Sequence, residues 1–508
     1  MEAAAPRARP DIATLALRSV GVLGTLATFA LNYRFVLQQL SNGPYLLDAG
    51  WFAYLLGAGD LALHNPSAIG GGTFYSFHLS PYLGLLSLAF HALGIDGFRA
   101  LALSEGVMFA GLTALLAFMA LRARPASLAA LVLTAAIGFS LLGNITLQIA
   151  SYPHFEIAFV TLGLLGAMLT RTRQPLWAIL PLGLLCLVRE DGGLYAALFL
   201  LASSLIFEGL PATPGAFTQR LAVRLAAGTL VGAALTLAIK QIYFGQFSAF
   251  TADFSGDGWR QLSLPFFGQR LLAVVVQPQW TITLAVTVVL GRINWRYLVF
   301  LLLISPLLIL QIIAVRPSIG RFELYYAIPW LIIWVGLFLA AYARSVAQQL
   351  RRPECLILFV GAMMLTTPIP AALGIPTAWF VARDTVLAPT VDLAALRTDV
   401  ERALSGRDKI CVSPGISGVA PDAVRPAQIL RDEPELSPCG TVFLYRGEMG
   451  YPRLKRRLDA AAFDVETVLA ERVEIYRRQN KGNFEPGVQG HQTGATRRPA
   501  HLPLTASP

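Results

Sequence analysis

The chain has 508 residues, of which 55% are hydrophobic and only 14% are charged. A soluble protein carries about 25% charged residues, so this composition excludes a large water-exposed surface and indicates a membrane protein. The net charge of +10 comes mostly from arginines at the ends of apolar runs. Membrane topology explains that placement better than nucleic-acid binding does, and we expect no nucleic-acid partner.

Apolar runs recur from the N-terminus to about residue 373, each long enough to cross a hydrocarbon core of about 30 Å or close to it. They predict an all-α polytopic membrane protein with about eleven transmembrane helices. The predicted spans lie near 14–37, 100–121, 126–143, 156–170, 175–188, 192–208, 222–244, 270–290, 297–315, 324–343 and 354–373.

The arginines predict the orientation, because short cytoplasmic loops carry an excess of Lys and Arg. With a cytoplasmic N-terminus, the inner ends receive 14 basic residues, which are Arg7, Arg9, Arg18, Arg122, Arg124, Arg171, Arg173, Arg220, Arg224, Arg292, Arg296, Arg344, Arg351 and Arg352. The outer ends receive 8, which are Arg34, Arg99, Arg189, Lys240, Arg260, Arg270, Arg316 and Arg321. An odd number of spans then places the C-terminal part outside the cytoplasm.

A long first outer loop is predicted over about residues 38–99. Its apolar segment 78–93 is short and has Pro81 near its start, and counting it as a span would invert every later loop. We therefore expect an interfacial or re-entrant helix there, and a second surface helix over 51–63.

The composition changes near residue 382. We expect a membrane domain over 1–381, a small extracytoplasmic α/β domain over 382–480, where strand-like and helical stretches alternate, and a disordered tail over 481–508. Cys411 and Cys439 lie in the polar part and could pair in an oxidising compartment.

Ionisable residues at membrane depth are costly and mark candidate sites. Asp48 is a lone acid in PYLLDAGWFAYLL, which is compatible with a site or with a helix N-cap before Ala49 or Gly50. His78, in TFYSFHLSP, is compatible with a site, a surface group or a cap. His154 and Glu156, in ASYPHFE, either face a cavity or lie at a solvated loop end.

The stretch LGLLCLVREDGGLYAALFLL is the most informative one. The apolar run from 175 to 207 is too long for one span and must fold back, with Arg189, Glu190 and Asp191 at the bend. A solvated turn with its own ion pair is the alternative. A later outer loop, RPSIGRFELYYAIPW, adds further charges and aromatics. Outer loops thus supply His, Asp, Glu and Arg while inner loops supply mainly Arg, which indicates a polar cavity facing outward.

The ordered segments LLDAGWF, FYSFHLSPYLGLL, ASYPHFEIAFV, LVREDGGLYAAL and FELYYAIPW resemble the bacterial membrane proteins called domain of unknown function 2079. The resemblance covers about residues 40–345. Ala49 replaces the family's Leu, Phe77 and His78 are transposed, and Arg189 replaces Lys. That family is similar to the GT-C class of membrane glycosyltransferases, which carry an acidic residue just after the first span. Asp48 occupies that place.

The resemblance implies a bacterial plasma-membrane enzyme that transfers a sugar from a polyprenyl-phosphate donor to an extracytoplasmic glycan, lipid or protein. Such chemistry needs a carboxylate to accept the acceptor's proton and cations to stabilise the departing phosphate. Asp48 is the expected base, and Arg189 with Arg316 or Arg321 the expected phosphate-binding group. The residues expected to contact or organise the substrates are His78, His154, Glu156, Arg189, Glu190, Asp191, Arg316, Arg321, Glu323 and Tyr325. The sequence identifies no certain cofactor, and Mg²⁺ or Mn²⁺ held by Asp48 with His or Glu partners is compatible with the set.

Two other functions remain open from the sequence. A transporter or lipid flippase would need polar groups through the depth of the membrane, whereas here they gather at one end. A non-catalytic scaffold would use the outer C-terminal domain for binding.

Overall fold

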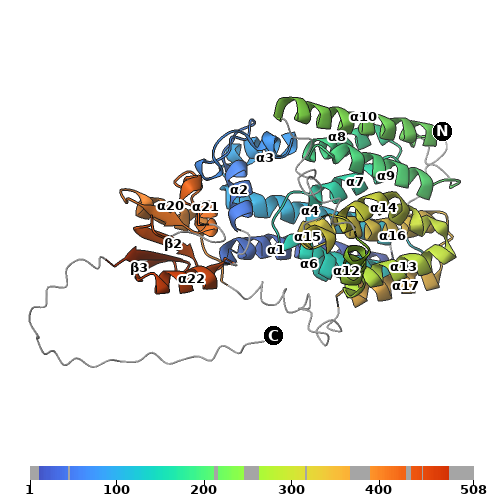
Figure 1. Cartoon of the computed structure of the whole chain (residues 1–508). Helices are drawn as coiled ribbons and strands as arrows, with labels where there is room; N and C mark the ends of the chain where they lie inside the picture. The colour runs from blue at the N-terminus through green and yellow to red at the C-terminus, as the bar shows by residue number, and fades with distance from the viewer. Residues whose placement is uncertain are drawn as a thin grey trace, which may run out of the picture.

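The computed structural model describes residues 11–43, 46–210, 215–244, 263–314, 317–366, 389–430, 436–448 and 450–479. The predicted tail over 481–508 lies outside these residues. The N-terminal part is a bundle of helices that run side by side, and the C-terminal part is a small domain at one end of it (Figure 1).

The helices of the bundle are α1 (Ile12–Asn42), α2 (Leu46–Gly57), α3 (Pro81–Ala92), α4 (Gly97–Ala120), α5 (Ala126–Leu142), α6 (Asn144–Ala150), α7 (Ile157–Leu169), α8 (Ile179–Val188), α9 (Gly192–Ile206), α10 (Gln219–Phe244), α12 (Leu264–Val275), α13 (Pro278–Ile293), α14 (Val299–Ile312), α15 (Pro317–Gly320), α16 (Ile328–Val346) and α17 (Arg352–Met364). Single 3-10 turns are η1 (Ser67–Ile69), η2 (Phe74–Ser76), η3 (Pro175–Ala178), η5 (Trp295–Leu298) and η6 (Leu324–Ala327).

Six helical stretches of the described chain are long and apolar enough to cross a membrane, or seven if the bent pair α12 and α13 forms one span. The structure thus supports a multi-pass helical membrane protein. The predicted spans over 156–170, 175–188 and 192–208 are the shorter apolar helices α7, α8 and α9, of 13, 10 and 15 residues. A full crossing takes about 20 residues, so the number eleven stays a prediction.

Local signals account for the helix ends. The Asp11 side chain accepts a hydrogen bond of 2.7 Å from the Thr14 N–H at the start of α1. Gly43 closes α1 in a left-handed conformation with φ of 78°. The first outer loop contains two helices, as expected, but α2 begins at Leu46 rather than at residue 51.

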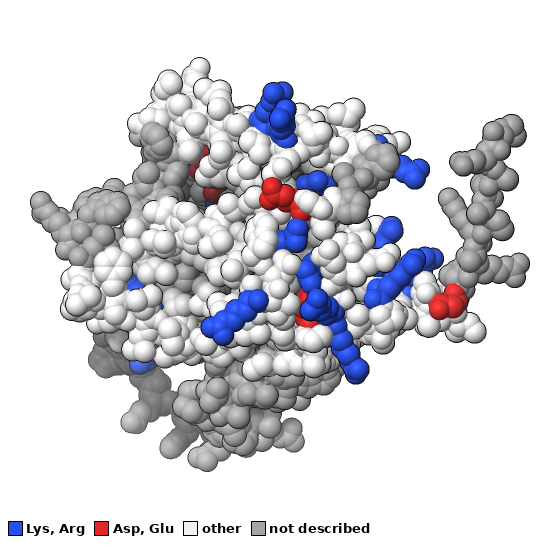
Figure 2. Space-filling view, turned by 90° about the vertical axis from the view of Figure 1, so that its right-hand side faces the viewer, with Lys and Arg blue, Asp and Glu red and all other residues white. Residues whose placement is uncertain are grey.

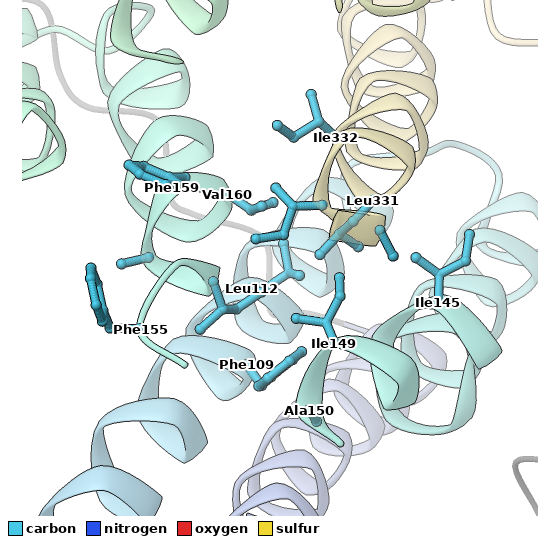
Figure 3. Packing of buried hydrophobic residues seen from close by; sticks show 14 of the residues in the cluster. Phe109, Leu112, Ile145, Ile149, Ala150, Phe155, Phe159, Val160, Leu331 and Ile332 are labelled. Atoms are coloured by element: carbon cyan, nitrogen blue, oxygen red, sulfur yellow. The ribbon is translucent and has the colours of Figure 1, made fainter. Parts of the chain in front are cut away.

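Side chains from α4, α6, α7 and α16 form the centre of the bundle (Figure 3). Phe109 and Leu112 of α4 meet Ile149 of α6, Val160 of α7 and Leu331 of α16, and all are buried. Helix α16 is the most enclosed of the long apolar helices, with 83% of its most apolar window buried. It therefore forms the axis around which the others pack.

The bundle end away from the C-terminal domain is rich in basic side chains, and Lys and Arg outnumber Asp and Glu on that face (Figure 2). Its loops join there, since the Ser345 hydroxyl donates to the Arg122 carbonyl at 2.8 Å and the Arg296 guanidinium to the Glu208 carbonyl at 2.6 Å. Two of the arginines expected on the inner side, Arg122 and Arg296, therefore lie in loops that are held together.

The predicted α/β domain is present. It consists of α20 (Leu393–Leu404), β1 (Ile410–Val412), α21 (Pro414–Val419), η7 (Pro426–Gln428), β2 (Thr441–Tyr445), α22 (Tyr451–Ala460), β3 (Phe463–Leu469) and β4 (Val473–Arg478). Its sheet has the order β1-β2-β4-β3, with β1 parallel to β2 and the other pairs antiparallel. A disulfide joins Cys411 and Cys439, as the sequence allowed.

The C-terminal domain packs directly on the first two helices. The Tyr445 hydroxyl donates a hydrogen bond of 2.6 Å to the Ser41 carbonyl at the end of α1. Helix α21 lies against α2 so closely that a Cβ built on Gly50 would be 2.5 Å from Gly418 Cα. Glycine at both positions is what allows the two backbones to approach. The helix that carries Asp48 is thus fixed between the bundle and the soluble domain.

Candidate functional site

Asp48 lies in the first turn of α2, not at its N-cap. The alternative interpretation of Asp48 as a helix cap is therefore wrong, because the helix starts at Leu46, three residues before Ala49. A carboxylate in the first turn is favoured by the helix dipole. Asp48 is exposed, and the Tyr152 hydroxyl donates a hydrogen bond to its Oδ2. This contact fixes one oxygen and leaves the carboxylate accessible.

A set of stacked rings lies next to this carboxylate. Tyr152 packs on Tyr325 with ring centroids 5.5 Å apart, and the His154 ring stacks on Tyr325 at 4.7 Å with an interplanar angle of 11°. The Tyr325 hydroxyl donates to that of Tyr326 at 2.7 Å. Burial lowers the pKa of His154 well below its ordinary value, so this ring is neutral at physiological pH. We call Tyr152, His154, Tyr325 and Tyr326 the aromatic wall.

Beneath the wall is an ion-pair network that includes the bend between α8 and α9. Arg189 donates to both Asp191 oxygens at 2.8 and 2.6 Å, and to Glu156 Oε1 at 2.9 Å. The other Glu156 oxygen contacts His154 Nδ1. Glu156 and Arg189 come from different apolar segments, and both are largely buried. The network therefore links the wall to the α8–α9 bend.

Glu190 belongs to a second network. Its carboxylate accepts hydrogen bonds from His78 Nδ1 at 3.2 Å, from the Leu79 N–H at 3.0 Å and from Lys240 Nζ at 2.9 Å. The Lys240 ammonium also donates to the Phe77 carbonyl. Burial opposes ionisation of Glu190, but the hydrogen bond from His78 and the charges of Arg189 and Lys240 hold the pKa of Glu190 well below its ordinary value.

The predicted site residues therefore fall into two adjoining networks. The first contains Asp48, His154, Glu156, Arg189, Asp191 and Tyr325, and the second contains His78 and Glu190. The two meet at the bend, because Glu190 lies between Arg189 and Asp191 in the chain. Asp191 holds Arg189, whereas Glu190 pairs with His78 and Lys240. Arg321 and Glu323 are well exposed and form a loose pair of 3.7 Å. Arg316 lies outside the described residues.

Three contributors were missed from the sequence. Tyr152 stands beside the recognised His154, and tyrosines near a membrane surface are usually interfacial belt residues. Lys240 and Glu105 are charges that lie among apolar residues of the long helices α10 and α4, and that signal was available. Glu105 is buried, accepts a hydrogen bond from the His154 backbone, and leaves Oε1 without a hydrogen-bond partner among the described atoms.

The arrangement offers one accessible carboxylate beside an aromatic surface, with charged groups behind it already neutralised. Arg189 uses Nε and both terminal nitrogens on carboxylates, so it is a positioning group rather than a ready phosphate ligand. Within the described parts of the chain, no group of three His, Cys, Asp or Glu side chains is arranged to hold a metal ion.

A scan against models of known protein families finds no match for this chain, and neither does a search among curated proteins.

Proposed function

We propose that this protein is a membrane glycosyltransferase of the GT-C type that transfers a sugar from a polyprenyl phosphate to an extracytoplasmic acceptor. The observation that carries the proposal is the exposed Asp48 carboxylate, held by Tyr152 beside the aromatic wall. The resemblance of the ordered sequence motifs to those of the family called domain of unknown function 2079 is the second argument for it.

The chemistry requires one deprotonation and one displacement. The acceptor hydroxyl gives its proton to Asp48 while its oxygen forms a bond to the anomeric carbon of the donor sugar. The bond between that carbon and the phosphate oxygen breaks, and its electron pair leaves with the polyprenyl phosphate. The phosphate is a good leaving group, so the site needs cations rather than a strong general acid.

The described residues divide these roles. Tyr152 directs one oxygen of Asp48 and leaves the other for the acceptor. The aromatic wall supplies the ring surface beside Asp48 for the apolar face of a sugar. Arg321 is exposed and lies four residues before Tyr325. Among the described residues its guanidinium forms only a loose ion pair with Glu323, so it is the group that binds the phosphate in this proposal, together with Arg316. Arg189 supports the wall from behind.

Asp48→Asn tests the base directly, because it keeps the size of the side chain and removes the proton acceptor. Incorporation of a labelled polyprenyl-phosphate sugar should fall by about 10²–10⁴-fold, the usual contribution of a general base. Asp399→Asn, at an exposed carboxylate paired with Arg402 in the C-terminal domain, is the matched control and should retain activity. Undiminished incorporation with Asp48→Asn would sink the assignment.

The basic end of the bundle supports the orientation (Figure 2). By the excess of Lys and Arg in cytoplasmic loops, that end faces the cytoplasm with the N-terminus, and Asp48 and the C-terminal domain face outward across a bacterial plasma membrane. A reporter protein that is active only in the cytoplasm, fused after Arg124, should be active. An inactive fusion would place Arg124 outside the cytoplasm and Asp48 inside it, on the wrong side for this donor.

The buried charges of α4 and α10 raise the alternative of a transporter. Glu105 binds the His154 backbone and Lys240 binds Glu190, so both extend the site rather than continue a path to the other end. A transported polyprenyl phosphate without sugar transfer would favour the alternative.

A further inference from the structure

A groove of about 780 Å³ lies between α5 and α17, at the bundle end far from Asp48. Its walls are mainly apolar and include Pro125, Leu128, Leu131, Thr134 and Phe359, and Arg352 is part of its lining. The volume is within the range of about 300–1,000 Å³ typical of small-molecule sites.

The two helices pack closely beyond the groove. At Gly138 they touch, since a Cβ there would lie 2.4 Å from the Met363 methyl carbon. The residues that line the groove lie nearer the start of both helices, from Pro125 to Thr134 and from Arg352 to Phe359. We call this groove the slot, and its end at Pro125 and Arg352 the mouth.

The slot has few polar groups, and the hydroxyl of Thr134 is already hydrogen-bonded within its own helix. It donates to the Ala130 carbonyl at 2.8 Å. Helices α5 and α6 together form a candidate membrane span, so the slot faces hydrocarbon over most of its length. Its natural content is an acyl chain rather than a water-soluble ligand.

The mouth of the slot carries arginine side chains whose positive charges are not paired with acidic side chains of the described residues. Glu354, the nearest acid on α17, is already bound by Arg344 through two hydrogen bonds of 2.7 and 2.9 Å. Across the described residues, no ion pair is formed by Arg352, by Arg351 or by Arg124, which directly precedes Pro125. All three side chains are exposed. A phosphate is the group that such guanidinium clusters bind best.

We propose that this slot binds one anionic phospholipid, with its phosphate at Arg352 and an acyl chain between α5 and α17. The site occupies the leaflet at the bundle end opposite the C-terminal domain. It is therefore independent of the donor site and of the proposed reaction.

Native mass spectrometry of the purified full-length chain, delipidated and then titrated with phosphatidylglycerol or phosphatidylcholine, tests the site. The unmodified chain should hold one phosphatidylglycerol more tightly than further copies, and more tightly than phosphatidylcholine. Arg352→Gln should weaken this first binding by about fivefold, as expected for one basic residue at a lipid surface. Inorganic phosphate should not displace the lipid, because it lacks the chain that fills the slot.

Thr134→Trp fills the slot without removing charge and should abolish the tight binding. The side chain is exposed, so the replacement leaves the core intact. Arg292→Gln removes an exposed arginine from the same bundle end outside the slot, and it should bind phosphatidylglycerol as the unmodified chain does. Equal weakening by Arg292→Gln and Arg352→Gln would show general charge attraction and overturn the proposal. Unchanged binding by Thr134→Trp, or equal affinity for both lipids, would overturn it too.

Discussion

Glu448→Gln should stabilise the C-terminal domain at alkaline pH and have a much smaller effect, about 1 kcal/mol, at pH 5. Glu448 is buried in the turn after β2, where Oε2 accepts a hydrogen bond of 2.7 Å from the Gly415 N–H. Oε1 is buried without a hydrogen-bond partner among the described atoms. A glutamine keeps the acceptor for Gly415 and carries no charge.

The magnitude follows from the pKa. Burial raises the pKa of Glu448 from 4.5 to about 7, against the opposing hydrogen bonds from Gly415 and Ser413. The pKa of Glu448 is higher in the folded domain than in the unfolded chain. Below pH 4.5 the carboxyl group is protonated in both states, so it does not lower the free energy of unfolding there. As the pH rises to about 7 the unfolded state loses its proton first, and the full cost of about 3 kcal/mol is reached above that pH.

The assay is the temperature at which a protease cleaves within residues 393–478 of the full-length protein, followed from pH 5 to pH 8.5. For a domain of this size, about 3 kcal/mol corresponds to a shift on the order of 10 °C. Glu466→Gln is the control with the opposite sign, because the pair with Arg407, at 2.8 and 3.0 Å, lowers the pKa of Glu466. Equal cleavage temperatures for Glu448→Gln and the unmodified chain at pH 8.5 would refute the reasoning.

Three further outcomes are expected. Lys240→Met should leave the Glu190 carboxylate buried without its ammonium partner and lower the free energy of unfolding by about 3–5 kcal/mol. Thermal unfolding of the double variant with Glu190→Leu should show that part of this stability returns, and no return would argue against the ion pair. Gly418→Val should force α21 away from α2, so that protease releases the C-terminal domain at lower temperature, whereas normal resistance would contradict the close packing. Reduction should retard the chain on a denaturing gel, and Cys411→Ser, which leaves Cys439 unpaired, should abolish that shift and lower the domain's stability by about 3–4 kcal/mol, the value for a loop closed by residues 28 apart.

Much of the fold follows from local patterns. Hydropathy located the apolar helices, and alternation of strand and helix signals located the C-terminal domain, because these elements depend on near neighbours in sequence. The 81° bend between α12 and α13 depends on packing around the bundle, and no local pattern near Pro278 fixed its size. The start of α2 was misplaced because residues 46–50, which precede the expected start, are themselves mostly apolar and carry no local signal of where the helix begins.

The site was predicted in part for the same reason. Arg189 and Asp191 are two residues apart, so their pairing could be expected from the bend. The contact of Tyr152 with Asp48 joins residues 104 apart, and that of Lys240 with Glu190 joins residues 50 apart. Each of these two contacts depends on how whole helices pack against one another, and that packing cannot be derived from a single sequence.

The contact between Gly50 and Gly418 has a consequence for the order in which the protein is completed. Helix α2 leaves the ribosome early, whereas the surface that covers it is made more than 360 residues later and, in the proposed orientation, must first cross the membrane. Until then the backbone around Asp48 lacks one of its two supports. A nascent or truncated chain would insert its helices yet hold an unfinished site, so docking of the α/β domain on α2 is the closing step in the assembly of this site.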